Sequence, residues 1–141
     1  MTGPVSERTA LYNLFNTTWS GLDPAVPVIT PNEKSLDQTD EWVRFTIKAG
    51  NAEVLEIGDP KRYTRTIGVV IIQVFVRPDT GDGRARELCD TIEGIFRNAE
   101  ASITDGSIRF REPTSTEVGL AENEAYYQMN VTVPYYRDEV R

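Results

Sequence analysis

The centre of the chain reads Arg65-Thr66-Ile67-Gly68-Val69-Val70-Ile71-Ile72-Gln73-Val74-Phe75-Val76. Successive side chains of an extended strand point to opposite faces of a sheet. Both faces of this strand are apolar, one with Ile67, Val69, Ile71 and Phe75, the other with Val70, Ile72, Val74 and Val76. Such a strand lies in the centre of a sheet with both faces covered by its own chain, or has one face covered by another subunit. Both explanations fit the pattern equally well.

Further strands are predicted on both sides of this one. Trp42–Ala49 alternates apolar and polar residues, as a half-buried strand does. Gly50-Asn51 is typical of a turn, so Glu53–Ile57 is predicted to return as the second strand of a hairpin. Towards the other end of the chain, Ser107–Arg111 and Ala125–Val133 predict two more strands.

Two helices frame these strands. Val5–Thr18 and Arg84–Ala99 carry apolar residues at helical spacing. Cys89 lies in the apolar stripe of the second segment and is predicted to be a buried, unreactive thiol. The segment between the first helix and Trp42 is broken by prolines and leaves room for only one short strand, Val26–Ile29. Glu112–Glu124 is polar and without clear periodicity, so no regular structure is expected there.

The order of these elements predicts the fold class. Strands that follow one another without intervening helices favour an antiparallel sheet. We therefore expect an α+β fold, with a mainly antiparallel, mixed sheet and two helices packed on one face. The 141 residues suit a single domain, 1–141.

The charge of the chain limits its partners. It has 22 acidic and 15 basic residues, and a net charge of −7. Excess carboxylate repels both phosphates and anionic lipid surfaces, so neither specific nucleic-acid binding nor membrane binding is expected. The N-terminal residues do not resemble a signal peptide and the single cysteine forms no internal disulfide, which together predict an intracellular protein.

The chain offers little for catalysis. Histidine is absent, which removes the commonest general base and metal ligand. We therefore expect no enzymatic activity, no cofactor and no metal. The one enzymatic motif is Asp79-Thr80-Gly81, the triplet of dimeric aspartic proteases. Arg77-Pro78 precedes it where an apolar run would be needed, so the protease is the weaker reading. Helix stabilisation by Asp79 and Asp82 is the simpler explanation.

The whole arrangement resembles the tail terminator proteins of long-tailed bacteriophages and prophages. The resemblance rests on the first helix ending in Trp19, the proline-broken loop Pro24–Asn32, and the central strand Arg65–Val76. It continues through the loop Thr80-Gly81-Asp82-Gly83 into the second helix, and ends at Val131-Thr132-Val133-Pro134.

This resemblance implies a structural function. The family implies a six-subunit ring that caps the tail tube, ends its polymerisation and forms the tail side of the head–tail junction. The implied partners are further copies of the chain, the tail tube protein and a neck or head-completion protein, while DNA passes through without specific binding. Such a protein assembles in the host cytoplasm and ends in the virion. The alternatives are a head–tail connector or neck protein of the same kind of phage, the aspartic protease, and a bacterial interaction module.

One local feature stands out against the acidity of the chain. The predicted turn Gly58–Arg65 contains Lys61, Arg62, Tyr63 and Arg65. Arginine and tyrosine are enriched where proteins meet. These four residues are the candidate partner contacts, and a solvated hairpin end is the alternative.

Overall fold

The computed structural model describes residues 4–19, 26–29, 41–57, 62–77, 82–97, 108–121 and 126–140. Within these ranges the chain forms helices α1 (Pro4–Trp19) and α2 (Gly83–Arg97). Six strands join them in one sheet: β1 (Val28–Ile29), β2 (Trp42–Ile57), β3 (Arg62–Val76), β4 (Ile108–Phe110), β5 (Thr114–Ala121) and β6 (Tyr126–Val140).

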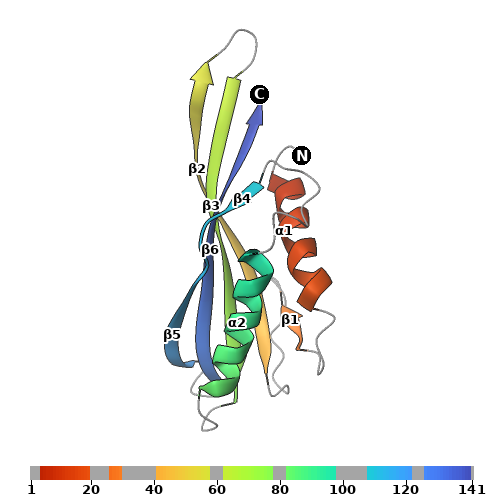
Figure 1. Ribbon diagram of the computed structural model, residues 1–141, viewed down its shortest axis with the longest axis vertical. Coiled ribbons are helices and arrows are strands. Elements are labelled where there is room, and N and C mark those ends of the chain that lie inside the picture. The colour runs from red at the N-terminus through yellow and green to blue at the C-terminus, as the bar shows by residue number, and fades with distance from the viewer. Residues whose placement is uncertain are drawn as a thin grey trace.

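The sheet is mixed and mainly antiparallel. Its order is β1-β2-β3-β6-β4, and β5 pairs with β6 beside β4. Only β1 and β2 run parallel, and β3 is central, as its apolar sequence predicts. Both helices lie on one side of the sheet (Figure 1), which confirms the predicted α+β fold.

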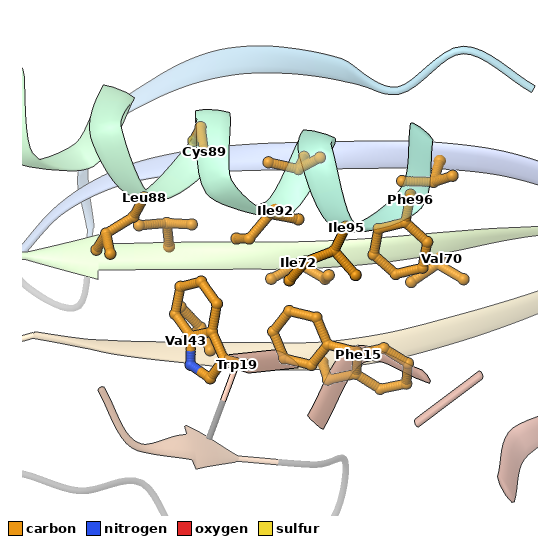
Figure 2. Close-up of a cluster of buried hydrophobic side chains, with 14 of the residues drawn as sticks. Phe15, Trp19, Val43, Val70, Ile72, Leu88, Cys89, Ile92, Ile95 and Phe96 are labelled. Carbon is orange, nitrogen blue, oxygen red and sulfur yellow. The ribbon is translucent and has the colours of Figure 1, made fainter. Parts of the chain in front are cut away.

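The core lies between this sheet face and the helices. Leu11, Phe15 and Trp19 recur every four residues of α1 and are buried. From α2, Leu88, Ile92, Ile95 and Phe96 point towards Val70 and Ile72 of β3 (Figure 2). Every second residue of β3 from Val70 to Val76 enters this core, because the side chains of a strand alternate between faces.

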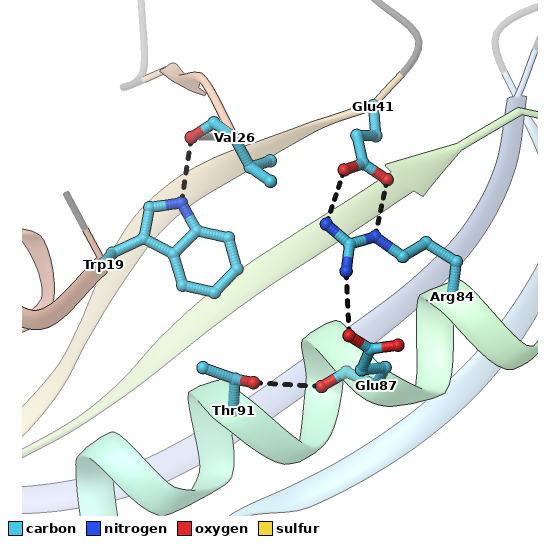
Figure 3. A network of polar contacts seen from close by, with 6 residues as sticks. All are labelled: Trp19, Val26, Glu41, Arg84, Glu87 and Thr91. Carbon is cyan, nitrogen blue, oxygen red and sulfur yellow. Dashed lines mark hydrogen bonds and ion pairs between the residues drawn. The ribbon is translucent and has the colours of Figure 1, made fainter. Parts of the chain in front are cut away.

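Two polar contacts fix the helices to the rest of the fold (Figure 3). The indole Nε1 of Trp19 donates a buried hydrogen bond to the carbonyl oxygen of Val26, 3.0 Å away. Arg84, in the first turn of α2, donates to both carboxylate oxygens of Glu41 at 2.9 and 2.7 Å, and to Glu87 at 2.9 Å. Since Glu41 directly precedes β2, Arg84 connects α2 to the start of that strand.

The predicted hairpin at Gly50-Asn51 is wrong. β2 is one continuous strand of 16 residues that pairs with β3 on both sides of this point. The register shifts between Ala49 and Ala52, so the glycine marks a β-bulge instead of a turn. A Cβ on Gly50 would lie 2.6 Å from the carbonyl oxygen of Ile67, which explains why glycine fits here.

The last strand continues past the predicted end at Val133. β6 runs to Val140 and contains Pro134, which cannot donate a backbone hydrogen bond. In a strand the N–H and C=O of one residue point to the same side, and the Pro134 carbonyl accepts from the amide of Arg111 at 2.8 Å. Pro134 therefore turns its missing donor towards the junction of β4 and β5, where the ladder to β6 is interrupted, and not towards β3.

The expectation that Glu112–Glu124 lacks regular structure is also wrong. Thr114–Ala121 forms β5, paired antiparallel with β6 along its whole length. Its pattern escaped detection because a bulge at Gly119, where φ is +102°, breaks the alternation. Ser115 and Glu117 face the helices, and the Ser115 hydroxyl lies 3.0 Å from Oε2 of Glu93 in α2.

Three strands extend beyond the helices and form what we call the arm. It consists of residues 50–57 of β2, 62–67 of β3 and 136–140 of β6, and it projects past the helical layer in Figure 1. Within the described residues, neither helix is long and apolar enough to cross a membrane.

Candidate partner-contact surface

Both helices pack on one face of the sheet, and neither covers the opposite face (Figure 1). We call it the helix-free face, and its described side chains in the central strands come from β2, β3 and β6. They are Trp42, Arg44, Thr46, Lys48, Arg65, Ile67, Val69, Ile71, Gln73, Phe75, Tyr126, Gln128, Asn130, Thr132, Pro134, Tyr136 and Asp138.

An apolar line runs along the middle of this face. Val69 and Ile71 are half-buried, and Ile67 is 41% exposed. Further along the same face, Trp42 and Phe75 stack with ring centroids 4.1 Å apart and, with Tyr126, are buried. On this face the exposed apolar surface is therefore concentrated around Ile67, at the base of the arm.

Arg65 is held rigidly at this place. Its Nε and Nη2 donate to the two carboxylate oxygens of Asp138 at 2.8 and 3.0 Å. Its guanidinium also lies over the Tyr136 ring, 4.2 Å from the centroid. The hydrogen bond from Arg65 lowers the pKa of Asp138 below its ordinary value, so the pair is ionised at neutral pH.

Two further arginines join this group from a distant part of the sequence. Arg109 pairs with Tyr136 across β4 and β6, and its charge also lowers the pKa of Asp138. The guanidinium of Arg111 lies 5.9 Å from the Tyr136 ring centroid. We call Arg65, Arg109 and Arg111, with Tyr136 and Asp138, the arginine cluster. Within the described residues, no carboxylate lies at ion-pair distance from Arg109 or Arg111.

The structure describes only some of the four residues that the sequence predicted as partner contacts. Arg62 and Tyr63 are the first residues of β3, opposite Ile57 and Glu56, and not part of a turn. Their side chains and the whole of Lys61 lie outside what the structure describes. Arg65 also belongs to β3, and its guanidinium is engaged by Asp138.

Sequence reasoning missed Arg109, Arg111 and Tyr136. A signal existed, because the alternation in Ile108-Arg109-Phe110-Arg111 places both arginines on one strand face. What the sequence could not supply is the pairing of β4 with residues 135–137, which brings this face beside Arg65.

The described residues show no constellation suited to catalysis. No group of His, Cys, Asp or Glu that could hold a metal occurs among them. Cys89 is buried as predicted, and burial raises the pKa of its thiol to about 11, so it carries no reactive thiolate at neutral pH. The triplet Asp79-Thr80-Gly81 and its proposed helix-stabilising Asp79 lie outside the described residues.

Comparison with known proteins agrees with the geometry. One solved structure superposes on the chain with a TM-score of 0.68, covering 92% of each chain at 16% sequence identity. At this identity the likeness shows the fold alone. No curated protein matches the sequence significantly.

A family profile covers nearly the whole described fold. Residues 8–135 match the profile of the phage tail terminator protein family, from within α1 to within β6. This is a family of structural proteins of the phage tail, and therefore of the virion. The chain belongs to the phage tail terminator family and is a structural protein of a bacteriophage tail.

Proposed function

We propose that this protein caps the finished tail tube as an oligomeric ring, ends tube polymerisation and forms the tail side of the head–tail junction. Membership of the tail terminator family supports this role over that of a neck protein. The observation that carries the proposal is the helix-free face, whose exposed Ile67 and arginine cluster suit contact with other proteins. Six copies in the ring are what the family resemblance implies.

The arm suits the capping role. It extends past the helical layer, so it reaches further along one direction than the core does (Figure 1). Edge and end residues of such an arm can meet the tube protein below the ring or a neck protein above it. Arg62 and Tyr63 begin β3 within the arm and, with Lys61 and Arg65, remain our candidates for contact with an acidic partner, either the next copy in the ring or the end of the tube.

The net charge of −7 supports the passage of DNA. A ring whose channel is lined with carboxylates repels the phosphates of DNA, so the genome crosses without being held. Assembly in the host cytoplasm followed by incorporation into the virion fits this role.

The test is tail length in a phage that lacks the gene for this protein. With the protein supplied in trans, we expect tails of uniform length joined to heads in electron micrographs. Without it, we expect tubes of variable length that carry no head. Tails of normal length that fail to join heads would assign the protein to the neck instead. Normal tails on normal heads in its absence would refute the proposal.

A further inference from the structure

The centre of the helix-free face is apolar where it is most exposed. Ile67 lies in the register of β3 opposite Tyr136, and Val69 lies opposite Lys48 and Pro134. Ile67 is one of three large apolar side chains that are clearly exposed among the described residues, and the other two, Val118 and Leu120, belong to β5. Apolar surface at the centre with charges around it is the pattern of a protein–protein contact.

Among the side chains that the structure describes, the charges on this face are mainly positive, whereas the chain as a whole is acidic. Lys48, Arg109 and Arg111 are exposed cations here, and the partly buried Arg44 and the Asp138-paired Arg65 add two more positive charges to the same face. Asp138 is the only carboxylate on this face among the side chains that the structure describes. The whole chain has a net charge of −7. The residues outside this face must therefore carry a net charge more negative than −7.

This combination argues against the face lining a DNA channel. Cations in a channel would bind phosphates and retard the genome. The apolar line through Ile67, Val69 and Ile71 gains nothing from a phosphate backbone, whereas it is buried favourably against a protein. A ring in which the helix-free face is turned away from the channel avoids both costs.

The same charges decide how two copies can meet. In a two-fold contact the same face lies on both sides, so its positive charges would oppose each other. A head-to-tail contact places this face against a different, acidic region of the next copy, and repeated head-to-tail contacts close into a ring. We infer that the helix-free face, centred on Ile67 and the arginine cluster, is the surface on which an acidic region of the neighbouring copy packs. This inference rests on the proposed ring.

The oligomeric state of the purified protein tests it. By sedimentation velocity over a range of concentrations, we expect the wild-type chain to form species larger than the 15.9 kDa monomer. The double change Arg109→Glu with Arg111→Glu reverses two exposed charges, and it should raise the dissociation constant of the assembly by about tenfold or more. Ile67→Asp should do the same by placing a charge in the apolar centre.

A matched control separates this face from net charge. Arg8→Glu with Arg86→Glu makes the same change in charge at exposed positions of α1 and α2, on the opposite side of the sheet. This control should assemble at least as tightly as the wild type does. Thermal unfolding of each variant establishes that the subunits remain folded.

Three results would overturn the inference: a wild-type chain that stays monomeric, one that stops at a two-fold dimer, or an Arg109/Arg111 variant that assembles normally. The proposed function fails differently. If the Arg109/Arg111 variant still supports tails of normal length, the face assignment is wrong and the capping role stands. If tails are normal without any copy of the protein, the capping role is wrong whatever the oligomeric state.

Discussion

Gly68 of β3 lies opposite Tyr135 of β6 and leaves room for its ring. A Cβ at this position would lie 2.6, 2.7 and 2.9 Å from atoms Oη, Cζ and Cε1 of Tyr135, whose side chain is buried. The ring of Tyr135 fills the space that any other residue would need. Because the ring is enclosed by the core, it cannot simply swing away.

We therefore expect Gly68→Ala to destabilise the fold by about 1–3 kcal/mol, the usual range for overpacking. Gly94→Ala is the matched control. It lies inside α2, and no heavy atom lies within 4 Å of its added Cβ. There alanine should stabilise by about 0.5–1 kcal/mol. The midpoints of urea unfolding measure the stability of both variants. If Gly68→Ala and Gly94→Ala shift the midpoint equally and in the same direction, the role assigned to the Tyr135 ring is refuted.

The Arg65–Asp138 pair makes stability depend on pH in a defined direction. The folded-state pKa of Asp138 lies below its ordinary value of 3.8, so folding favours the ionised carboxyl. Its contribution is complete above that value and is lost as the pH falls through the lower, folded-state pKa. Because the two side chains are 31% and 42% exposed, we expect no more than about 0.5–1 kcal/mol from it.

The comparison of wild type with Arg65→Gln tests this. The difference in unfolding free energy should be present at neutral pH and shrink towards zero as the pH falls well below 3.8. Arg109→Gln, which removes a charge that does not hydrogen-bond Asp138, should give a smaller difference. If the difference in unfolding free energy between wild type and Arg65→Gln stays constant at acidic pH, Arg65 stabilises the fold by packing on Tyr136 and not through its ion pair with Asp138.

At the scale of elements, Arg84 and Arg86 are two arginines in one helical turn with different surroundings. Arg84 connects α2 to Glu41, and the side chains of that pair are 32% and 21% exposed. The hydrogen bond to Glu41 raises the pKa of Arg84. Arg86 binds Asp82 at 2.6 Å, but those side chains are 55% and 49% exposed and belong to the same turn.

Arg84→Ala should therefore cost about 1–2 kcal/mol, since it breaks a two-point, partly buried contact between elements. Arg86→Ala should cost less than about 0.5 kcal/mol, as exposed ion pairs do. Thermal unfolding compares the two at equal change in charge. A larger loss for Arg86→Ala would mean that the contact with Glu41 does not hold α2 in place.

The elements that local periodicity governs were predictable. α1, α2 and the central strand have the expected faces, because each repeats an apolar residue at the spacing of its own structure. Three features were not predictable, for one shared reason: the bulge at Gly50-Asn51, the continuation of β6 through Pro134, and the strand β5. Each depends on which strand lies alongside: β3 continues past Gly50, β4 and β5 leave a junction at Pro134, and β6 pairs with an irregular β5.

The candidate contact residues were predictable to the same extent, where the sequence pattern is local, and not where it depends on strand pairing. Arg65 was identified from its neighbours in sequence, where a basic run is visible in an acidic chain. Arg109, Arg111 and Tyr136 join it only through the pairing of β3, β6 and β4. Local composition was therefore enough to predict one arginine of the cluster. The other two could be identified only from the register between strands that are distant in sequence.

At the scale of the whole molecule, the acidity of the chain predicts that the protein does not bind DNA. We expect no binding of a labelled duplex by fluorescence anisotropy at physiological salt, because a net charge of −7 repels phosphate. The Arg109→Glu, Arg111→Glu variant should give the same result. If the wild type binds and this variant does not, the arginine cluster contacts DNA and the helix-free face belongs to the channel.

The arm has a consequence for how related chains can vary. In the arm, Arg65 of β3 is aligned with Glu53 of β2 and Asp138 of β6, and side chains along each strand alternate between faces. Inserting a single residue into one strand would turn every later side chain to the wrong face unless a β-bulge absorbed it, as β2 does between Ala49 and Ala52. Adding two residues to β2 and two to β3 would lengthen the projection by about 7 Å while leaving the core unchanged. Paired additions of this kind would change the length of the arm without altering the contacts between the sheet and the helices.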